Sequence, residues 1–550
     1  MKQFFRPVAL VAACVALAAC THAAGGPGGP ASAGHRVNSW TVPHVLRYAT
    51  GEDVNTLNPL LGQQESLGFM SSLTMAWLIK WDRHNRPYPE LATEVPSKAN
   101  GGVSKDGLTI TYHLRKGVKW SDGAPFTADD VVWTIHAILN PANDVISREG
   151  WDRIKKIGEP NKYTVVLHLS KPYSPFIETF FSSAGANPCI LPKHLLAKYP
   201  NINHVAYNSL PVGIGPFKYE AWDRGQKVVM VRNPYYWRGE PKLKEIDFEI
   251  VPDRTTVLTE LEAKELDMWA LVSGNYFQRA KALAPFTYVR QPGYSFDHLD
   301  FNLTRPRVKD LAVREALQYA TNRAELIKKV GHGVGILREE PAPSIAPYYD
   351  PAIKMVPYDI AKANRILDAA GWKRGRDGIR AKNGVRLVLD FATSSGTPDV
   401  DEEIELIRQS WKKIGVGINV RHYPASLLFA PYAEGGIVYK GNWDVVGFQW
   451  FIDPIGDFSS EYACNQIPPN GQNDLHWCNA KADAAMRALY THYDQAKRNK
   501  DDAIVMEQLD HDVPTIVTSG TENIYVFNRD LRNFHPNQVT PFDNMMDVDI

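Results

Sequence analysis

The residue patterns that most often indicate catalysis do not occur in this sequence. It contains no His-Glu-x-x-His metal helix, no Gly-x-Ser-x-Gly nucleophile turn and no phosphate-binding P-loop. The 16 histidines are scattered and none pairs with another at metal-ligand spacing on a convincing helix. The carboxylate pairs Asp129-Asp130 and Glu402-Glu403 fall where helices are expected to begin, and the helix dipole favours acidic residues there. We therefore predict no catalytic residue, no metal site and no cofactor.

A string of aromatic residues is a better candidate for function, and the function is binding. Phe448, Trp450 and Phe451 stand within four positions of one another. Their rings could line a cleft and hold apolar side chains, or stack on a sugar-like solute. They could equally be core aromatics beside a turn, and the residues alone leave both interpretations open.

Residues 107–140 show the most regular pattern of apolar and polar residues in the sequence. Apolar and polar residues alternate from Leu108 to Leu114, which predicts a half-buried strand, and the alternation at Val118 and Trp120 predicts a second one. Thr127 with Asp130 forms a capping-box pattern at the start of a helix that should end at Asn140-Pro141. The segment therefore predicts a strand–turn–strand–helix unit.

The string from Gly107 to Trp133 resembles the signature of the family 5 solute-binding proteins, the dipeptide, oligopeptide and nickel receptors of ABC importers. Residues 212–219, 233–237 and 246–251 resemble the same family. The resemblance implies an α/β, two-lobed fold like that of the periplasmic binding proteins, of type II and enlarged to three subdomains. A hinge and a ligand cleft would lie between the lobes.

The chain is long enough for several cores, because 550 residues exceed what one core normally organises. We expect residues 38–80, 205–300 and 521–550 to form lobe 1 (domain I), residues 81–204 an inserted subdomain (domain II), and residues 301–520 lobe 2 (domain III). That the tail returns to the first lobe is implied by the resemblance alone.

The N-terminus predicts export. Lys2 and Arg6 precede an apolar run over 7–19, and Leu17-Ala18-Ala19-Cys20 resembles a lipobox. Residues 1–20 would then be a lipoprotein signal peptide, Cys20 the lipidated residue and residues 21–37 a flexible tether. The alternative is a plain signal peptide with Cys20 incidental. We expect the protein in the periplasm or on the outer face of the cytoplasmic membrane.

Charge and cysteine usage agree with this. The chain carries 61 basic and 61 acidic residues, and this balance argues against a nucleic-acid partner. Cys464 and Cys478 bracket a polar loop, and outside the cytoplasm a nearby pair tends to oxidise. A metal pair is the alternative from the residues, whereas the resemblance supports a disulfide. Cys189 is expected to be a buried free thiol.

The resemblance also directs attention to ligand residues and raises doubt about one ligand. Asp453 matches an Asp-Pro position of the family's peptide receptors, but the aspartate that holds a peptide α-amine falls here at Trp450 or Phe451. An arginine that holds the carboxylate in some dipeptide receptors falls near Ser394 and Ser395. Losing such charges disfavours dipeptides and leaves longer peptides, modified peptides or apolar solutes open. Tyr294 and Phe296 are weaker candidates that could be structural.

The sequence thus predicts the substrate-binding lipoprotein of an ABC importer. It would capture a peptide, an oligopeptide in preference to a dipeptide, or another small solute by hinge closure and pass it to a permease and its ATPase. The alternatives are a surface lipoprotein that senses ligands or chaperones proteins, and a secreted hydrolase. A receptor for nickel or a metal chelate is a further possibility within the family.

Overall fold

The structure is a computed structural model, and it describes residues 38–62, 64–183, 189–396, 398–452 and 454–550. Cys20, the rest of the predicted signal peptide, the predicted tether and Asp453 lie outside the described residues. None of the described helices combines the length and the apolar character needed to cross a membrane.

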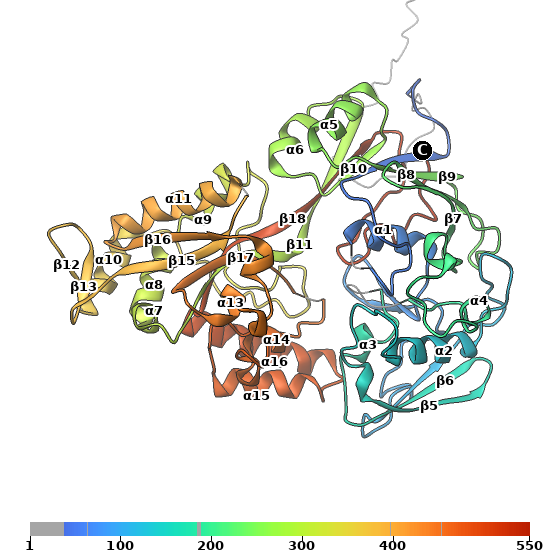
Figure 1. Ribbon diagram of the computed structural model, residues 1–550, viewed down its shortest axis with the longest axis horizontal. Coiled ribbons are helices and arrows are strands. Elements are labelled where there is room, and N and C mark those ends of the chain that lie inside the picture. The colour runs from blue at the N-terminus through green and yellow to red at the C-terminus, as the bar shows by residue number, and fades with distance from the viewer. Residues whose placement is uncertain (1–37, 63, 184–188, 397, 453) are drawn as a thin grey trace, which may run out of the picture. The chain divides into compact units, whose positions relative to one another are not determined.

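A ten-stranded mixed sheet runs through the fold (Figure 1). In spatial order its strands are β16 (Gly417–Tyr423), β15 (Val388–Ser394), β17 (Val445–Phe451), β11 (Phe286–Phe301), β18 (Thr515–Asn528), β10 (Met268–Ala270), β1 (Val45–Thr50), β9 (Glu245–Ile250), β8 (Lys227–Arg232) and β7 (Phe217–Asp223). The central strands β11 and β18 are also the longest, with 16 and 14 residues. They connect the strands of the N-terminal half with those from residue 388 onward.

The pairing of β11 with β18 is interrupted at one place. The antiparallel register runs from Phe286↔Asn528 to Pro292↔Glu522 and resumes at Phe296↔Gly520. Residues 293–295 therefore face Thr521 alone. Such a bulge turns side chains away from the regular pleat, here those of Tyr294 and Ser295. A Cβ atom on Gly293 would lie 2.4 Å from Thr521 Oγ1, so a side chain at this position would force the Thr521 side chain to shift.

The buried apolar residues form separate clusters on the two sides of the central strands β11 and β18. The first cluster runs from Leu46 to Ala270 and closes with residues 525–548. It combines residues of the expected lobe 1 with residues of the expected inserted subdomain. The second and third clusters take their members from residues 294–517. The two central strands contribute to clusters on both sides, as Tyr525 in the first and Phe296 in the third show.

The segment that resembles the family signature folds largely as its pattern predicts. Three antiparallel strands, β4 (Thr109–His113), β6 (Thr164–Leu169) and β5 (Ile154–Asn161), form a small sheet beside α2 (Ala128–Leu139). The Asp130 carboxylate accepts a hydrogen bond from the Thr127 backbone N–H at 3.0 Å, which fixes the helix start. The prediction of a second strand at Val118–Trp120 is wrong, because Lys119 makes an isolated bridge with Pro125 there.

Two smaller sheets and the remaining helices complete the fold. The small sheets pair β2 (Ile79–Trp81) with β3 (Pro87–Pro89), and β12 (Lys373–Arg374) with β13 (Arg380–Lys382) and β14 (Val385–Arg386). The other helices are α1 (Glu65–Thr74), α3 (Phe176–Thr179), α4 (Lys193–Leu196), α5 (Arg254–Ala263), α6 (Gly274–Ala280), α7 (Pro306–Lys309), α8 (Leu311–Ala320), α9 (Arg323–Lys329), α10 (Ile360–Ala369), α11 (Pro398–Lys413), α12 (Ala425–Leu428), α13 (Ile437–Lys440), α14 (Ser459–Tyr462), α15 (Ala480–Leu489) and α16 (Gln495–Asp512).

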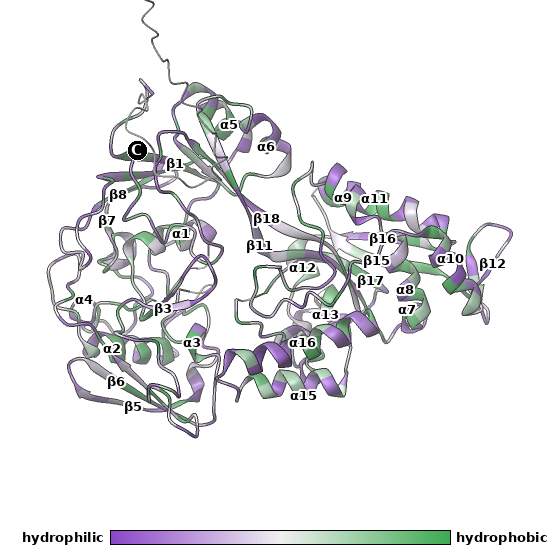
Figure 2. Cartoon of the chain, turned by 180° about the vertical axis from the view of Figure 1, so that it is seen from behind, coloured by the Kyte–Doolittle hydropathy of each residue, from purple (hydrophilic) through white to green (hydrophobic). Residues whose placement is uncertain are grey.

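The helices α15 and α16 pack against each other with one face buried. Figure 2 shows hydrophobic and hydrophilic bands alternating along both helices, as expected of helices buried on one side. The loop before α15 is closed by a disulfide between Cys464 and Cys478, the two cysteines expected to pair. Cys189 is a buried free thiol, and burial raises its pKa to about 12.

Candidate binding cavities

A cavity of about 410 Å³, called the central cavity below, lies beside the bulge of β11. One part of its wall comes from the segment around α1 and from residues 538–541. The other part comes from the central strands and the end of β17, through Tyr294, Ser295, Phe451 and Thr521. The bulge supplies the side chains of the strand wall, because it frees residues 294 and 295 from the regular register with β18.

Three buried hydroxyl groups of this wall have no hydrogen-bond partner in the protein. They are Ser71 Oγ on α1, Ser183 Oγ and the Tyr525 hydroxyl on β18, and each residue is at most 3% exposed. A buried polar group without a partner costs about 1–3 kcal/mol. Such groups are tolerated where ordered water or a bound molecule supplies the missing partner. The cavity therefore has the properties of a binding site for a guest with several hydrogen-bonding groups.

The predicted aromatic residues take different positions around the central cavity. Tyr294 and Phe451 line it, and Phe451 is 51% exposed while Tyr294 is 3% exposed. Phe296 is fully buried in the third core cluster, below the Arg338 guanidinium. Phe448 packs edge-on against His298 with ring centroids 4.4 Å apart. The Trp450 Nε1–H group donates a hydrogen bond to a carboxylate oxygen of Glu461 at 2.8 Å.

Ser394 is the last residue of β15 and Ser395 follows it, where the Ser395 backbone N–H donates to the Tyr423 carbonyl at 2.8 Å. Neither serine is among the residues that line the central cavity. Ligand contact by the eight predicted binding residues stays a prediction, with Tyr294 and Phe451 the two that the central cavity brings together.

A second cavity, of about 550 Å³, adjoins the central one and is called the acidic cavity. The two share Glu65, Leu271, Ser295, Thr521 and Asn523. Five carboxylates and one guanidinium line the acidic cavity: Glu65, Asp297, Asp399, Glu403, Glu522 and Arg254. The central cavity, in contrast, has Glu65 as its single charged residue among those described.

Specific donors hold Asp297 in the wall of the acidic cavity. Ser519 Oγ donates to one carboxylate oxygen at 2.8 Å, and Gln449 Nε2 donates to the other at 3.2 Å. The pKa of Glu403 is raised to about 7, mainly because the group is removed from water and to a smaller extent because of the negative charge of Asp297. Both carboxylates line this cavity, and their charges repel each other.

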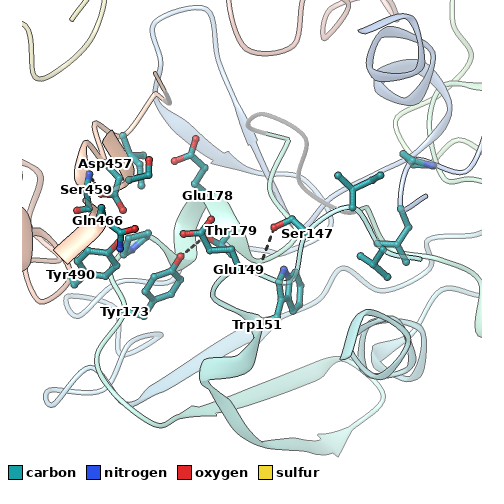
Figure 3. A pocket seen from close by; sticks show the side chains of 17 residues that line it. Ser147, Glu149, Trp151, Tyr173, Glu178, Thr179, Asp457, Ser459, Gln466 and Tyr490 are labelled. Carbon is teal, nitrogen blue, oxygen red and sulfur yellow. Dashed lines mark hydrogen bonds between the residues drawn. The ribbon is translucent and has the colours of Figure 1, made fainter. Parts of the chain in front are cut away.

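A further cavity of about 290 Å³, the side cavity, lies between residues 145–179 and residues 455–490 (Figure 3). The Tyr173 hydroxyl and Thr179 Oγ1 are 3.0 Å apart there. The pKa of Glu149 is raised, mainly because the group is removed from water and to a smaller extent because of the charge of Asp457. Its wall joins the segment after α2 to the segment just before α14.

Sequence reasoning did not find Ser71, Ser183, Tyr525, Asp297 or Glu403 as site residues. A serine within a helix such as α1 gives no signal in the sequence that its hydroxyl lacks a partner. The pair Glu402-Glu403 indicates a helix start, but α11 begins at Pro398, so Glu403 lies beyond the first turn, to which the dipole argument is limited. Among the described residues, no group of three or more His, Cys, Asp or Glu side chains is arranged to hold a metal ion.

The sequence profile described as "Bacterial extracellular solute-binding proteins, family 5 Middle" matches residues 86–466. The chain therefore belongs to family 5 of the bacterial extracellular solute-binding proteins, and its fold is the mixed α/β fold of that family.

Similar proteins within this family include a receptor named for a metal. The chain is 32% identical to Protein XP55 of Streptomyces lividans, over 75% of this chain and 72% of the relative. It is 30% identical to the nickel-binding periplasmic protein of Escherichia coli, over 73% and 76%. The crystal structure of NikZ from Campylobacter jejuni with Ni(L-His) superimposes with a TM-score of 0.72 at 25% identity, covering 92% of this chain and 99% of that one.

Proposed function

We propose that this protein is the lipid-anchored receptor of an ABC importer, which captures peptides outside the cytoplasm, oligopeptides in preference to dipeptides. The observation that supports the proposal most is the central cavity with its three buried, unpartnered hydroxyl groups. A peptide main chain carries donors and acceptors at every residue and could satisfy such groups. A relative named oligopeptide-binding protein AppA, from Bacillus subtilis, is 25% identical over 83% of this chain.

Capture would work by hinge closure about the central strands. The cavity wall combines α1, which belongs to the first core cluster, with Tyr294 of the third. In this proposal residues 38–80, 205–300 and 521–550 form one lobe, residues 81–204 its inserted subdomain, and residues 301–520 the other lobe. The guest must bind the closed form more tightly than the open one, since equal affinity would shift no population. The closed form would then dock on the permease, while Cys20 carries the anchor.

Native mass spectrometry of the purified protein tests the ligand class. Co-purified peptides of mixed sequence are the expected result, and a single non-peptide mass would overturn the peptide assignment. Small-angle scattering with and without the released mixture tests closure. The radius of gyration should fall when the mixture is added, and an unchanged radius with proven binding would contradict hinge closure.

Mass spectrometry of the membrane-extracted protein tests the anchor. A diacyl or triacyl modification at Cys20 is expected, and Cys20→Ser should release the protein from the membrane. An unmodified N-terminus elsewhere would contradict the lipid anchor without affecting the ligand assignment.

A further inference from the structure

The acidic cavity is unusual in the balance of charge along its wall. Glu522 is paired with Arg290, whose Nε donates to the carboxylate at 2.8 Å. Within the described part of the chain, Glu65, Asp297, Asp399 and Glu403 form no ion pair. Four carboxylates therefore remain around one guanidinium, Arg254. Like charges that converge on a partly enclosed space repel each other unless a cation joins them.

Helix capping and the dipole account for some of these acids but not for all. Asp399 lies in the first turn of α11, where the dipole stabilises an acid. Glu403 lies in the next turn, beyond the reach of the helix dipole. Asp297 is on the strand β11, so neither a cap nor a helix dipole accounts for it. The Ser519 and Gln449 donors keep the Asp297 carboxylate in place and add no positive charge.

The buried guanidinium of Arg338 interacts with the charge of Asp297 but donates its hydrogen bond to the backbone. Arg338 Nη2 donates to the Ser295 carbonyl at 3.0 Å, and Arg338 does not line the acidic cavity. Burial lowers its pKa to about 10, and the charges of Tyr348 and then Asp297 partly oppose this. Asp297 and Glu403 are thus two acids of one cavity wall, and neither forms an ion pair with a cation of the described residues.

A second observation points to a missing partner in the same cavity. Thr518, on β18 beside Ser519, also lines the acidic cavity and is 1% exposed. Its hydroxyl lies near Glu403, where it opposes part of the rise in pKa that removal from water causes. No protein atom, however, meets Thr518 Oγ1 with hydrogen-bond geometry. A buried hydroxyl next to two facing carboxylates is an arrangement that a bound group with several N–H donors would complete.

We propose that the acidic cavity holds a positively charged group of the cargo, an ammonium or guanidinium group, between Asp297 and Glu403. The proposal rests on the proposed peptide-binding function and names the chemistry of one end of the guest. The body of the guest would continue past the shared residues Glu65, Ser295 and Thr521 into the nearly uncharged central cavity. The cation would be either a free α-amine or the side chain of a lysine or arginine.

Three pools of synthetic tetrapeptides distinguish these sources. The first has free N-termini and contains no Lys, Arg or His; the second is the same pool N-acetylated; the third is N-acetylated with one Lys per peptide. All carry amidated C-termini, and binding is measured by calorimetry on the full-length protein. We expect the first or third pool to bind at least about tenfold more tightly than the second.

Two variants test the named residues. Asp297→Asn and Glu403→Gln keep the shape of each side chain and should each reduce the preference for the cationic pool by about tenfold. Glu402→Gln is the matched control, because Glu402 is adjacent on α11, is exposed and does not line the cavity. It should leave the preference unchanged. Circular dichroism confirms that each variant is folded.

The outcomes separate the two proposals. If the three pools bind equally, or if both variants retain the full preference, the cation assignment is overturned and the peptide-receptor function stands. If no pool binds, the peptide-receptor function itself fails, and the cation assignment fails with it.

Discussion

At the scale of single residues, two phenylalanines near the bulge should have different roles, one in ligand binding and the other in the stability of the fold. Phe451 is 51% exposed and lines the central cavity, whereas Phe296 is fully buried. Phe451→Ala should weaken peptide binding by about tenfold and change the free energy of unfolding by less than about 1 kcal/mol. Phe296→Ala should lower the free energy of unfolding by about 3–5 kcal/mol. Calorimetric titration and urea denaturation measure the two effects, and a large loss of stability in Phe451→Ala would contradict this assignment.

A buried glutamate predicts a pH dependence of stability. Burial raises the pKa of Glu340 from 4.5 to about 8, and its Oε1 accepts from the Asp350 N–H at 3.1 Å. In the unfolded chain the group ionises near its ordinary pKa of 4.5, while in the folded protein it stays protonated to about pH 8. Its stabilising contribution is therefore full below pH 4.5 and is lost as the pH rises to about 8.

Glu340→Gln should remove this loss. The free energy of unfolding of the variant, minus that of the wild type, should rise by roughly 1–3 kcal/mol between about pH 5 and about pH 8.5. Urea denaturation at the two pH values measures it. The exposed Glu434→Gln serves as the control, and the same difference at both pH values for Glu340→Gln would refute an elevated pKa.

At the scale of elements, the bulge in β11 places a glycine against a side chain of β18. A Cβ atom at Gly293 would meet Thr521 Oγ1, so Gly293→Ala should destabilise the protein by about 1–3 kcal/mol. In a Thr521→Ala background the same change should cost less than about 1 kcal/mol, because the clashing atom is gone. Denaturation of the four proteins of this cycle measures the coupling, and additive costs would mean that the strain lies elsewhere.

The disulfide should stabilise the loop before α15. Cys464 and Cys478 are 14 positions apart, and opening a loop of this size costs about 3 kcal/mol. Cys464→Ser/Cys478→Ser should therefore unfold at lower urea concentration, whereas Cys189→Ala should not open a loop. Equal stability with and without reductant would contradict a structural role.

The elements are largely predictable from the sequence, whereas the cavities are not. Alternation from Leu108 and the Thr127/Asp130 pattern identify β4 and α2, because local periodicity and caps determine them. The family resemblance supplies the fold. The bulge and the unpartnered hydroxyls arise from contacts between segments far apart in the chain, as with Ser295 and Thr521, whose hydrogen bond of 2.9 Å spans 226 positions. No local pattern contains that information.

At the scale of the whole molecule, bound cargo should couple the unfolding of the separate cores. The central cavity has walls from the first and the third core clusters. Cargo at about 100 times its Kd should add about 2.7 kcal/mol to the free energy of unfolding. Scanning calorimetry should show broad or separate transitions without cargo and a single sharper one with it. An unchanged profile at saturation would contradict a cavity shared between cores.

The place of β18 in the sheet also has a consequence for biosynthesis. It lies between β11 and β10, yet it is the last of the described strands along the chain. Until residue 528 has been synthesised, both of those neighbours present an open strand edge and the halves of the sheet have no shared partner. Ribosome-bound chains that stop before Thr515 should therefore remain loosely folded and bind chaperones, which is the condition in which a polypeptide can be threaded through a secretion channel.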